Sequence, residues 1–144
     1  MKKFYSHSTS ETEKIAADLA ATLKGNEVLA MFGTLGMGKT AFVRGLAKGL
    51  GNESEISSPT FAIVHDYGGN PHLYHFDMYR ISTWDDLYST GFFDYLDMGG
   101  ILAVEWSENI ENVLPENYMR IEFEKSESEN ERIITIYEPG EANT

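Results

Sequence analysis

Residues 33–40 read Gly-Thr-Leu-Gly-Met-Gly-Lys-Thr, and they constrain the fold of this chain more than any other stretch does. Gly33, Gly38, Lys39 and Thr40 satisfy the pattern GxxxxGK[ST] in full. In this pattern the glycines let backbone N–H groups curl around phosphate oxygens, and a helix begins with its positive dipole end toward them. The lysine bridges β and γ oxygens, and the threonine hydroxyl binds Mg²⁺. The alternative is a glycine-rich turn that only caps a helix.

The flanking residues favour the phosphate site. Val28–Phe32 is a short, wholly apolar run, which is typical of a strand buried on both faces of a sheet. After Lys39, apolar residues recur at helical spacing until Gly51. A buried strand followed by the loop and a helix is the context that the motif requires, so we predict nucleotide binding. The expected contacts are Gly33, Thr34, Leu35, Gly36, Met37, Gly38, Lys39, Thr40 and Ala41.

Hydrophobic periodicity assigns the rest of the 144 residues to one domain. Ser10 and Glu13 have capping-box spacing, and apolar residues then recur at helical spacing, which predicts a helix from Ser10 until Gly25. Further along, the expected elements are strands at 61–67, 73–77 and 101–104, helices at 83–88, 92–96 and 107–113, and a closing hairpin of 119–124 with 132–137. We therefore predict an α/β chain with a three-layer P-loop NTPase fold, a mixed, partly parallel sheet and a C-terminal antiparallel hairpin. The domain is expected over 1–138, and 139–144 as a disordered tail.

Charge is unevenly distributed. Residues 1–50 hold seven Lys and Arg against four Asp and Glu, whereas residues 51–144 hold four against nineteen, which together give the net charge of −12. An acidic surface repels nucleic-acid backbones, so we expect no unaided binding to RNA or DNA and consider a basic protein partner more natural. The alternative is that the acidity only keeps the protein soluble. No apolar run reaches membrane-spanning or signal-peptide length, so a cytoplasmic protein without membrane contact is expected.

Two apolar strands end in acids that suit a phosphate site. Asp77 follows Leu73–Phe76, and Glu105 follows Ile101–Val104. Ligands gather at the carboxyl ends of parallel strands, where a P-loop enzyme needs carboxylates to hold Mg²⁺ and place the attacking water. We therefore take Lys39, Asp77 and Glu105 as candidate catalytic residues. For either acid alone, an ordinary strand-end turn remains the alternative.

Other candidates are weaker. The segment Ser57–Thr60 lies where phosphate-sensing switches occur, although its residues alone favour a simple turn. Trp106 either stacks on a nucleotide or belongs to the core. His72 and His75, three residues apart on a strand, face opposite sides and do not favour a metal pair. No Asn-Lys-x-Asp motif is present, which favours ATP over GTP, and the scarcity of basic residues after Gly51 argues against a small-molecule kinase.

Five motifs in order resemble the bacterial TsaE (YjeE) family, from about Ser10 to Tyr137. They are Gly33–Thr40, Val-Arg-Gly-Leu at 43–46, Ser-Pro-Thr-Phe at 58–61, His-Phe-Asp-Met-Tyr-Arg at 75–80 and Val-Glu-Trp-Ser-Glu at 104–108. The resemblance implies a P-loop ATPase needed for threonylcarbamoyladenosine at position 37 of tRNAs that read codons beginning with A. It also implies action on the TsaB–TsaD pair, with ATP hydrolysis resetting that complex between turnovers.

The resemblance further implies roles for single residues. Lys39 and Thr40 would hold phosphate and Mg²⁺, Glu105 would be the magnesium-associated glutamate, and Asp77 would position water or metal. Thr60 would be the switch threonine, Trp106 would lie near the nucleotide, and Glu11 and Arg132 would reach it. The chain departs from the family at Thr34, where an acid is usual, and at Ala41, where a Thr or Ser hydroxyl often contacts the α-phosphate.

Three functions remain open from the sequence. The first is a magnesium-dependent ATPase, slow without its partners because no arginine finger is evident. The second is a non-catalytic module whose ATP binding only shapes a partner-facing surface through Ser57–Thr60. The third, least favoured, is a small-molecule kinase.

Overall fold

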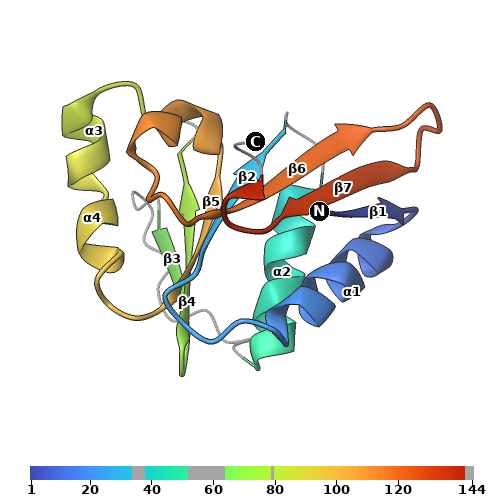
Figure 1. Ribbon diagram of the computed structural model, residues 1–144, viewed down its shortest axis with the longest axis horizontal. Coiled ribbons are helices and arrows are strands. Elements are labelled where there is room, and N and C mark those ends of the chain that lie inside the picture. Colours follow the sequence, from blue (N-terminus) through green and yellow to red (C-terminus); the bar gives the residue numbers. More distant parts are fainter. Residues whose placement is uncertain (34–37, 52–63, 79, 142–144) are drawn as a thin grey trace.

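The computed structural model describes residues 1–33, 38–51, 64–78 and 80–141, which form one seven-stranded sheet with helices on both faces (Figure 1). The strand order is β1-β7-β6-β2-β5-β4-β3. The elements are β1 (Lys2–Ser6), α1 (Thr9–Ala20), β2 (Val28–Phe32), α2 (Lys39–Leu50), β3 (Val64–Gly69), β4 (His72–Asp77), α3 (Trp84–Ser89), α4 (Phe92–Tyr95), β5 (Ile101–Glu105), the 3₁₀ helix η1 (Ser107–Val113), β6 (Met119–Lys125) and β7 (Arg132–Tyr137).

The centre of the sheet is parallel. Strand β2 runs parallel to both β5 and β6, and β4 runs parallel to β5. The edges are antiparallel, with β3 on β4 at one side and β6, β7 and β1 at the other. The predicted mixed sheet and C-terminal hairpin are therefore confirmed. Because β2, β4 and β5 point the same way, their carboxyl ends lie at one edge of the sheet.

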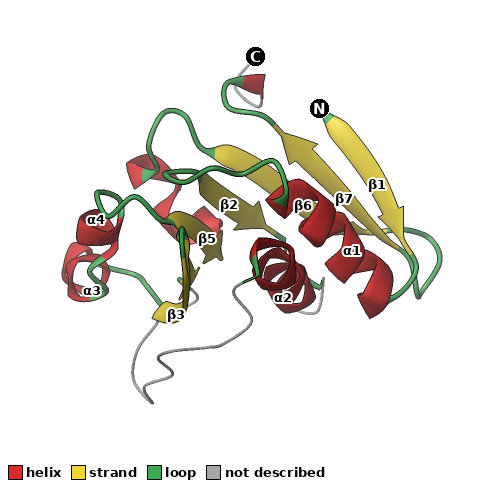
Figure 2. Cartoon of the chain, turned by 90° about the horizontal axis from the view of Figure 1, so that it is seen from below, coloured by secondary structure: helices red, strands yellow, loops and turns green. Residues whose placement is uncertain are grey.

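The sheet and the helices on its two faces form three layers, and an apolar cluster fills the space on each face of the sheet. On one face α1 and α2 cover a cluster that includes Leu29, Met31, Phe42 and Ile121. On the other face α3, α4 and η1 cover a second cluster of buried apolar side chains. Figures 1 and 2 show the two helical groups on opposite sides of the strands. Along β4, Leu73 belongs to the first cluster and the next residues Tyr74 and Phe76 to the second. Strand alternation therefore places His75 and Asp77 on the α2 side.

The N-terminal region differs from the sequence prediction. Strand β1 was not predicted, because most of its side chains are exposed and show no apolar alternation. Helix α1 begins at Thr9, and its cap is Ser8, whose hydroxyl accepts the Glu11 N–H at 3.1 Å. The prediction of Ser10 as the cap is wrong, since Ser10 lies inside the helix. The helix ends at Ala20, before the predicted stop at Gly25.

The remaining boundaries differ little. The strand predicted at 61–67 is described from Val64 onward, and 61–63 lie outside the described residues. At the C-terminal end, Glu141 accepts the Glu138 N–H at 2.7 Å and pairs with the N-terminal ammonium at 2.5 Å, while 142–144 lie outside the described residues. Within the described part of the chain, no helix has both the length and the apolar character needed to cross a membrane.

Candidate active site at the phosphate loop

The junction of β2 and α2 requires glycine. Gly33 has φ 147° and Gly38 has φ 90°, both in the region that side-chain-bearing residues avoid. A Cβ on Gly33 would lie 2.9 Å from the Phe123 carbonyl oxygen, so space also excludes a side chain there. Several residues predicted to contact the nucleotide lie outside the described part of the chain: Thr34, Leu35, Gly36, Met37 and Thr60. The whole segment Ser57–Thr60, considered as a phosphate-sensing switch, also lies outside it. Their contacts remain predictions.

The first turn of α2 suits an anion. Gly38 precedes the helix without a side-chain cap, and no acid lies in the first turn. The first N–H groups of a helix have no partner within the helix, and together with the dipole of this helix end they favour negative charge. Thr40 is exposed at this turn, where its hydroxyl can reach a ligand, whereas Ala41 is buried against the protein.

Lys39 is almost inaccessible to solvent, with only 4% of its surface exposed. Its Nζ donates to the Gly33 carbonyl oxygen at 2.6 Å and lies 4.1 Å from the centre of the Trp106 ring. Both contacts hold the cation at the start of the loop. The carbonyl bond is one that phosphate oxygens could replace, because they are stronger acceptors for an ammonium.

Three carboxylates act on the Lys39 ammonium. Burial lowers the pKa of Lys39 below its ordinary value, while the negative charges of Glu108, Glu105 and Asp77 oppose that change. Opposite charges interact at useful strength only over short distances in a partly shielded site. The electrostatics therefore place the predicted catalytic residues Lys39, Asp77 and Glu105 in one neighbourhood, together with Glu108.

Asp77 and Glu105 end neighbouring parallel strands in the same register. Glu105 is buried, and its carboxylate is hydrogen-bonded to His75 Nε2, whereas Asp77 is exposed. The Met78 N–H donates to the Glu105 carbonyl oxygen at 3.0 Å, which fixes the two strand ends to each other. The two acids therefore have different surroundings. Glu105 is held in one orientation by protein contacts, and Asp77 faces solvent, where it can meet water.

Trp106 follows Glu105 in a left-handed conformation, with φ 59° and ψ 41°. For a residue with a side chain this conformation costs about 1–2 kcal/mol, and such strain is often found at functional sites. The turn is held by the buried Ser107 hydroxyl, which donates to the Val104 carbonyl at 2.8 Å, and by the Asn109 side chain, which donates to the Met78 carbonyl at 2.7 Å. Trp106 also packs on the second apolar cluster, so it is both a core residue and a neighbour of Lys39.

Two residues near the site had no predicted role. Glu108 accepts the Gly33 N–H at 2.9 Å and so ties η1 to the start of the loop. The sequence signal was its place at the end of the Val-Glu-Trp-Ser-Glu motif. His75 contacts Glu105, and its signal was the two-residue spacing from Asp77, which puts both on one strand face. His72 contacts a different carboxylate, that of Asp66, at 2.9 Å.

A cavity of about 250 Å³ adjoins the start of α2 and brings distant segments together. It is lined by Ser6, His7, Ser8, Thr9, Thr12, Gly38, Ala41, Asn130 and Arg132. The predicted contacts Arg132, Ala41 and Gly38 thus share one space. Glu11 is not part of the lining, but its carboxylate lies 3.1 Å from His7 Nδ1. Arg132 is itself anchored by donating to the carbonyls of Glu129 and Glu131.

Comparisons with known proteins agree on one family. The family model described as "Threonylcarbamoyl adenosine biosynthesis protein TsaE" matches residues 6–134. The chain is 39% identical over 127 residues to the tRNA threonylcarbamoyladenosine biosynthesis protein TsaE of Bacillus subtilis, covering 88% of this chain and 78% of the relative. It is 42% identical over 113 residues to the TsaE of Aquifex aeolicus, covering 75% and 78% of the two chains.

A solved structure shows the same fold. The crystal structure of Bacillus subtilis YdiB superimposes with a TM-score of 0.75 and 36% sequence identity, covering 96% of this chain and 86% of that one. The arrangement of this chain, with a strand, a glycine loop and a helix at the edge of a partly parallel sheet, is therefore that of a P-loop NTPase.

Proposed function

The chain belongs to the TsaE family, and we propose that it is a magnesium-dependent ATPase that acts on the TsaB–TsaD pair in the cytoplasm. Family membership supports a role in the biosynthesis of threonylcarbamoyladenosine in tRNA. One observation carries the finer proposal of hydrolysis. Two strand-end carboxylates, Asp77 and Glu105, act on the buried Lys39 ammonium beside the uncapped start of α2.

The residues present suit a magnesium ion. Mg²⁺ prefers oxygen ligands and keeps several waters, so it needs few protein groups. The exposed Thr40 hydroxyl and the Glu105 carboxylate offer such oxygens, and we propose that they hold the ion directly or through water. When bound with ATP, Mg²⁺ would supply positive charge to the β and γ oxygens. His75 keeps the Glu105 carboxylate oriented toward this task.

Lys39 supplies charge to the transferred phosphoryl group. Its Nζ exchanges the Gly33 carbonyl for phosphate oxygens, and burial strengthens that interaction because little water competes. The exposed Asp77 carboxylate accepts a hydrogen bond from the attacking water and orients it. Partner binding completes the site, so hydrolysis by the isolated chain is slow.

The cavity beside the loop accommodates the rest of the nucleotide. Arg132 offers a guanidinium to the sugar or base, and Glu11 acts through His7 at the cavity wall. Ala41 provides no hydroxyl for the α-phosphate. The loss of one such hydrogen bond lowers affinity by about fivefold, from a typical net value near 1 kcal/mol.

Two substitutions test the ATPase. Lys39→Ala removes the buried cation, and nucleotide binding measured by calorimetry is expected to be lost. Glu105→Ala leaves the loop and Lys39 intact, so binding is expected to remain within about tenfold while phosphate release falls by at least a hundredfold. Glu124→Ala, an exposed acid on β6, is the matched control and should change neither quantity. Normal hydrolysis by the Glu105 variant would exclude this mechanism.

The alternative is an ATP-sensing module without catalysis. Single-turnover phosphate release, measured with and without TsaB–TsaD, separates the two functions, because a sensor releases none in either condition. The pathway role is tested by reconstituting threonylcarbamoyladenosine synthesis over several turnovers. Equal yields with and without this protein would remove that role.

A further inference from the structure

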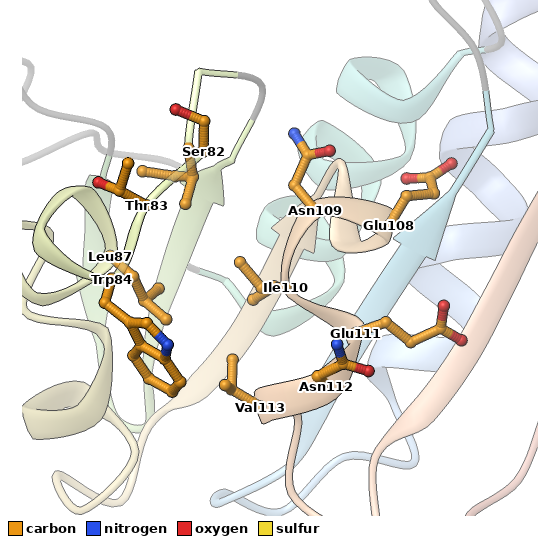
Figure 3. A pocket seen from close by; sticks show the side chains of 11 residues that line it. Ser82, Thr83, Trp84, Leu87, Glu108, Asn109, Ile110, Glu111, Asn112 and Val113 are labelled. Atoms are coloured by element: carbon orange, nitrogen blue, oxygen red, sulfur yellow. The ribbon is translucent and has the colours of Figure 1, made fainter.

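A groove of about 390 Å³ lies outside the phosphate site, between the start of α3 and η1. Figure 3 shows Thr83, Trp84 and Leu87 on one side of it and Asn109, Ile110 and Val113 facing them from the other. Leu87 and Ile110 are buried apolar side chains. The lining thus combines apolar side chains with polar ones, which is the usual make-up of a protein's binding grooves.

Aromatic side chains extend the groove onto the surface. Trp84 is 59% exposed and lies parallel to Phe93, with ring centres 6.5 Å apart. Tyr88, 64% exposed, contacts the same Phe93 ring at 5.4 Å. Exposed Trp and Tyr side chains that are already ordered by stacking lose little entropy when a partner covers them. The array is therefore suited to binding another protein.

Carboxylates far outnumber cations in this region. Residues 81–119 contain no Lys, Arg or His. They contain eight carboxylates: Asp85, Asp86, Asp94, Asp97, Glu105, Glu108, Glu111 and Glu116. Of these, Glu108 and Glu111 belong to the lining, but their side chains point away from α3 (Figure 3), where Glu108 accepts the Gly33 N–H and Glu111 pairs with Arg120 at 3.1 Å. Asp85, next to Trp84, is exposed at the rim. An occupant that places positive charge at the rim gains attraction and faster association, whereas an acidic occupant is repelled.

The groove is in direct contact with the phosphate site. Glu108 lines it and also accepts the Gly33 N–H at 2.9 Å. Asn109 lines it and donates to the Met78 carbonyl, one residue beyond Asp77. An occupant that contacts η1 therefore contacts residues that hold the phosphate loop and the end of β4.

We propose that this groove is the docking site for a segment of the TsaB–TsaD pair that carries Lys or Arg beside apolar side chains. The apolar side chains lie between Leu87 and Ile110 and against Trp84, and the cations lie at the acidic rim near the exposed Asp85. The identity of the partner rests on the proposed function. The location of the docking site rests on charge complementarity and on the exposed aromatic side chains.

The test measures the affinity of the purified TsaB–TsaD pair from the same genome for variants of this chain. Trp84→Ala is expected to weaken binding at least tenfold, as truncation of a central aromatic side chain does. Asp85→Asn, at the exposed acid beside Trp84, is expected to weaken it about threefold at low salt and less at 0.5 M NaCl, where surface charges are screened. The controls are Tyr5→Ala, an aromatic residue of similar exposure on β1, and Glu127→Gln on the distant β6–β7 turn.

Intrinsic ATP hydrolysis and the folded state, checked by circular dichroism, are measured for the same variants. Selective weakening by the two groove variants, with unchanged intrinsic hydrolysis, supports the proposal. Equal affinity of groove variants and controls overturns it and leaves the proposed function standing. No binding by the unmodified chain overturns both the docking site and the proposed partner. Self-association of the chain through Trp84, seen as a dimer by light scattering, would also overturn the proposal, since a second copy would then occupy the groove.

Discussion

At the scale of single residues, the Lys39 ammonium shows two opposing effects. Burial disfavours the charged form, and the nearby Glu108, Glu105 and Asp77 favour it, but burial dominates and the pKa of Lys39 is lowered. A buried cation that is not fully compensated attracts further negative charge. Within the described part of the chain Lys39 forms no salt bridge that an anionic ligand would have to break, so its surroundings prepare it for such a ligand.

His7 gives a pH-dependent prediction. Hydrogen bonds to Glu11 and Glu131 raise the pKa of this imidazole above its ordinary value of 6.5. Its contribution to stability is therefore complete below pH 6.5 and is lost as the pH rises through the folded-state pKa. The free energy of unfolding in urea should fall between pH 6 and pH 9, and this fall should be smaller in His7→Asn than in the unmodified chain. His72→Asn, which removes a different imidazole–carboxylate pair, is the control. An identical pH dependence in the His7 variant would contradict this assignment.

Residue by residue, the sequence predicted the site only in part. Lys39 followed from the loop motif, and Asp77 and Glu105 from their position after apolar strands. The contacts of His75 and Glu108 could not be predicted in the same way. The first depends on the register between β4 and β5, and the second on the left-handed turn at Trp106, and neither is encoded in local residue spacing.

At the scale of elements, α1 and α2 approach closely because of glycine. A Cβ at Gly45 would lie 2.2 Å from the Glu13 carbonyl oxygen, which is backbone and cannot rotate away. In an isolated helix, Gly→Ala stabilises by about 1 kcal/mol. In this protein we expect Gly45→Ala to destabilise by roughly 1–3 kcal/mol, because overpacking exceeds the gain in helix propensity. Urea unfolding checks the sign, and an increase in stability would show that α1 can shift at little cost.

The start of α1 gives a second prediction at this scale. Ser8 accepts the Glu11 N–H at the helix end, whereas Ser10 lies within the first turn. Ser8→Ala should therefore cost about 1 kcal/mol, the usual value of an N-cap, and Ser10→Ala should be nearly neutral. Thermal unfolding of the two variants gives the comparison. A larger loss of stability in Ser10→Ala than in Ser8→Ala would show that Ser10 is the N-cap, as the sequence predicted.

The elements that the sequence pattern predicted correctly are those whose apolar residues form a clear pattern. Strand β2 and helix α2 have the predicted bounds of Val28–Phe32 and Lys39–Leu50, because one is wholly buried and the other has a clear apolar face. Strand β1 has neither property. It exists because its backbone pairs with β7 at the edge of the sheet, a contact between residues more than 120 positions apart.

At the scale of the whole molecule, the first and last strands lie side by side. Strand β1 pairs antiparallel with β7 (Figure 1). The Met1 ammonium also contacts the Glu141 carboxylate. Alternation of strands and helices could predict the parallel centre of the sheet. It could not predict that the first strand joins the far edge, because that placement depends on which edge remains unpaired after the hairpin of β6 and β7 has formed.

The unequal charge of the whole chain gives the last prediction. With a net charge of −12, repulsion among carboxylates opposes the compact state, and ion pairs such as Lys48–Glu13 offset only part of it. Salt screens both the repulsion and the ion pairs. Because acids are in excess, the stability gained from weaker repulsion is larger than the stability lost from weaker ion pairs. We expect the free energy of unfolding in urea to rise by on the order of 1 kcal/mol between 20 mM and 500 mM NaCl. Potassium chloride should give the same rise, because screening does not depend on which monovalent cation is used. A fall in stability with salt would mean that the ion pairs between the basic N-terminal third and the acidic remainder contribute more than the repulsion does.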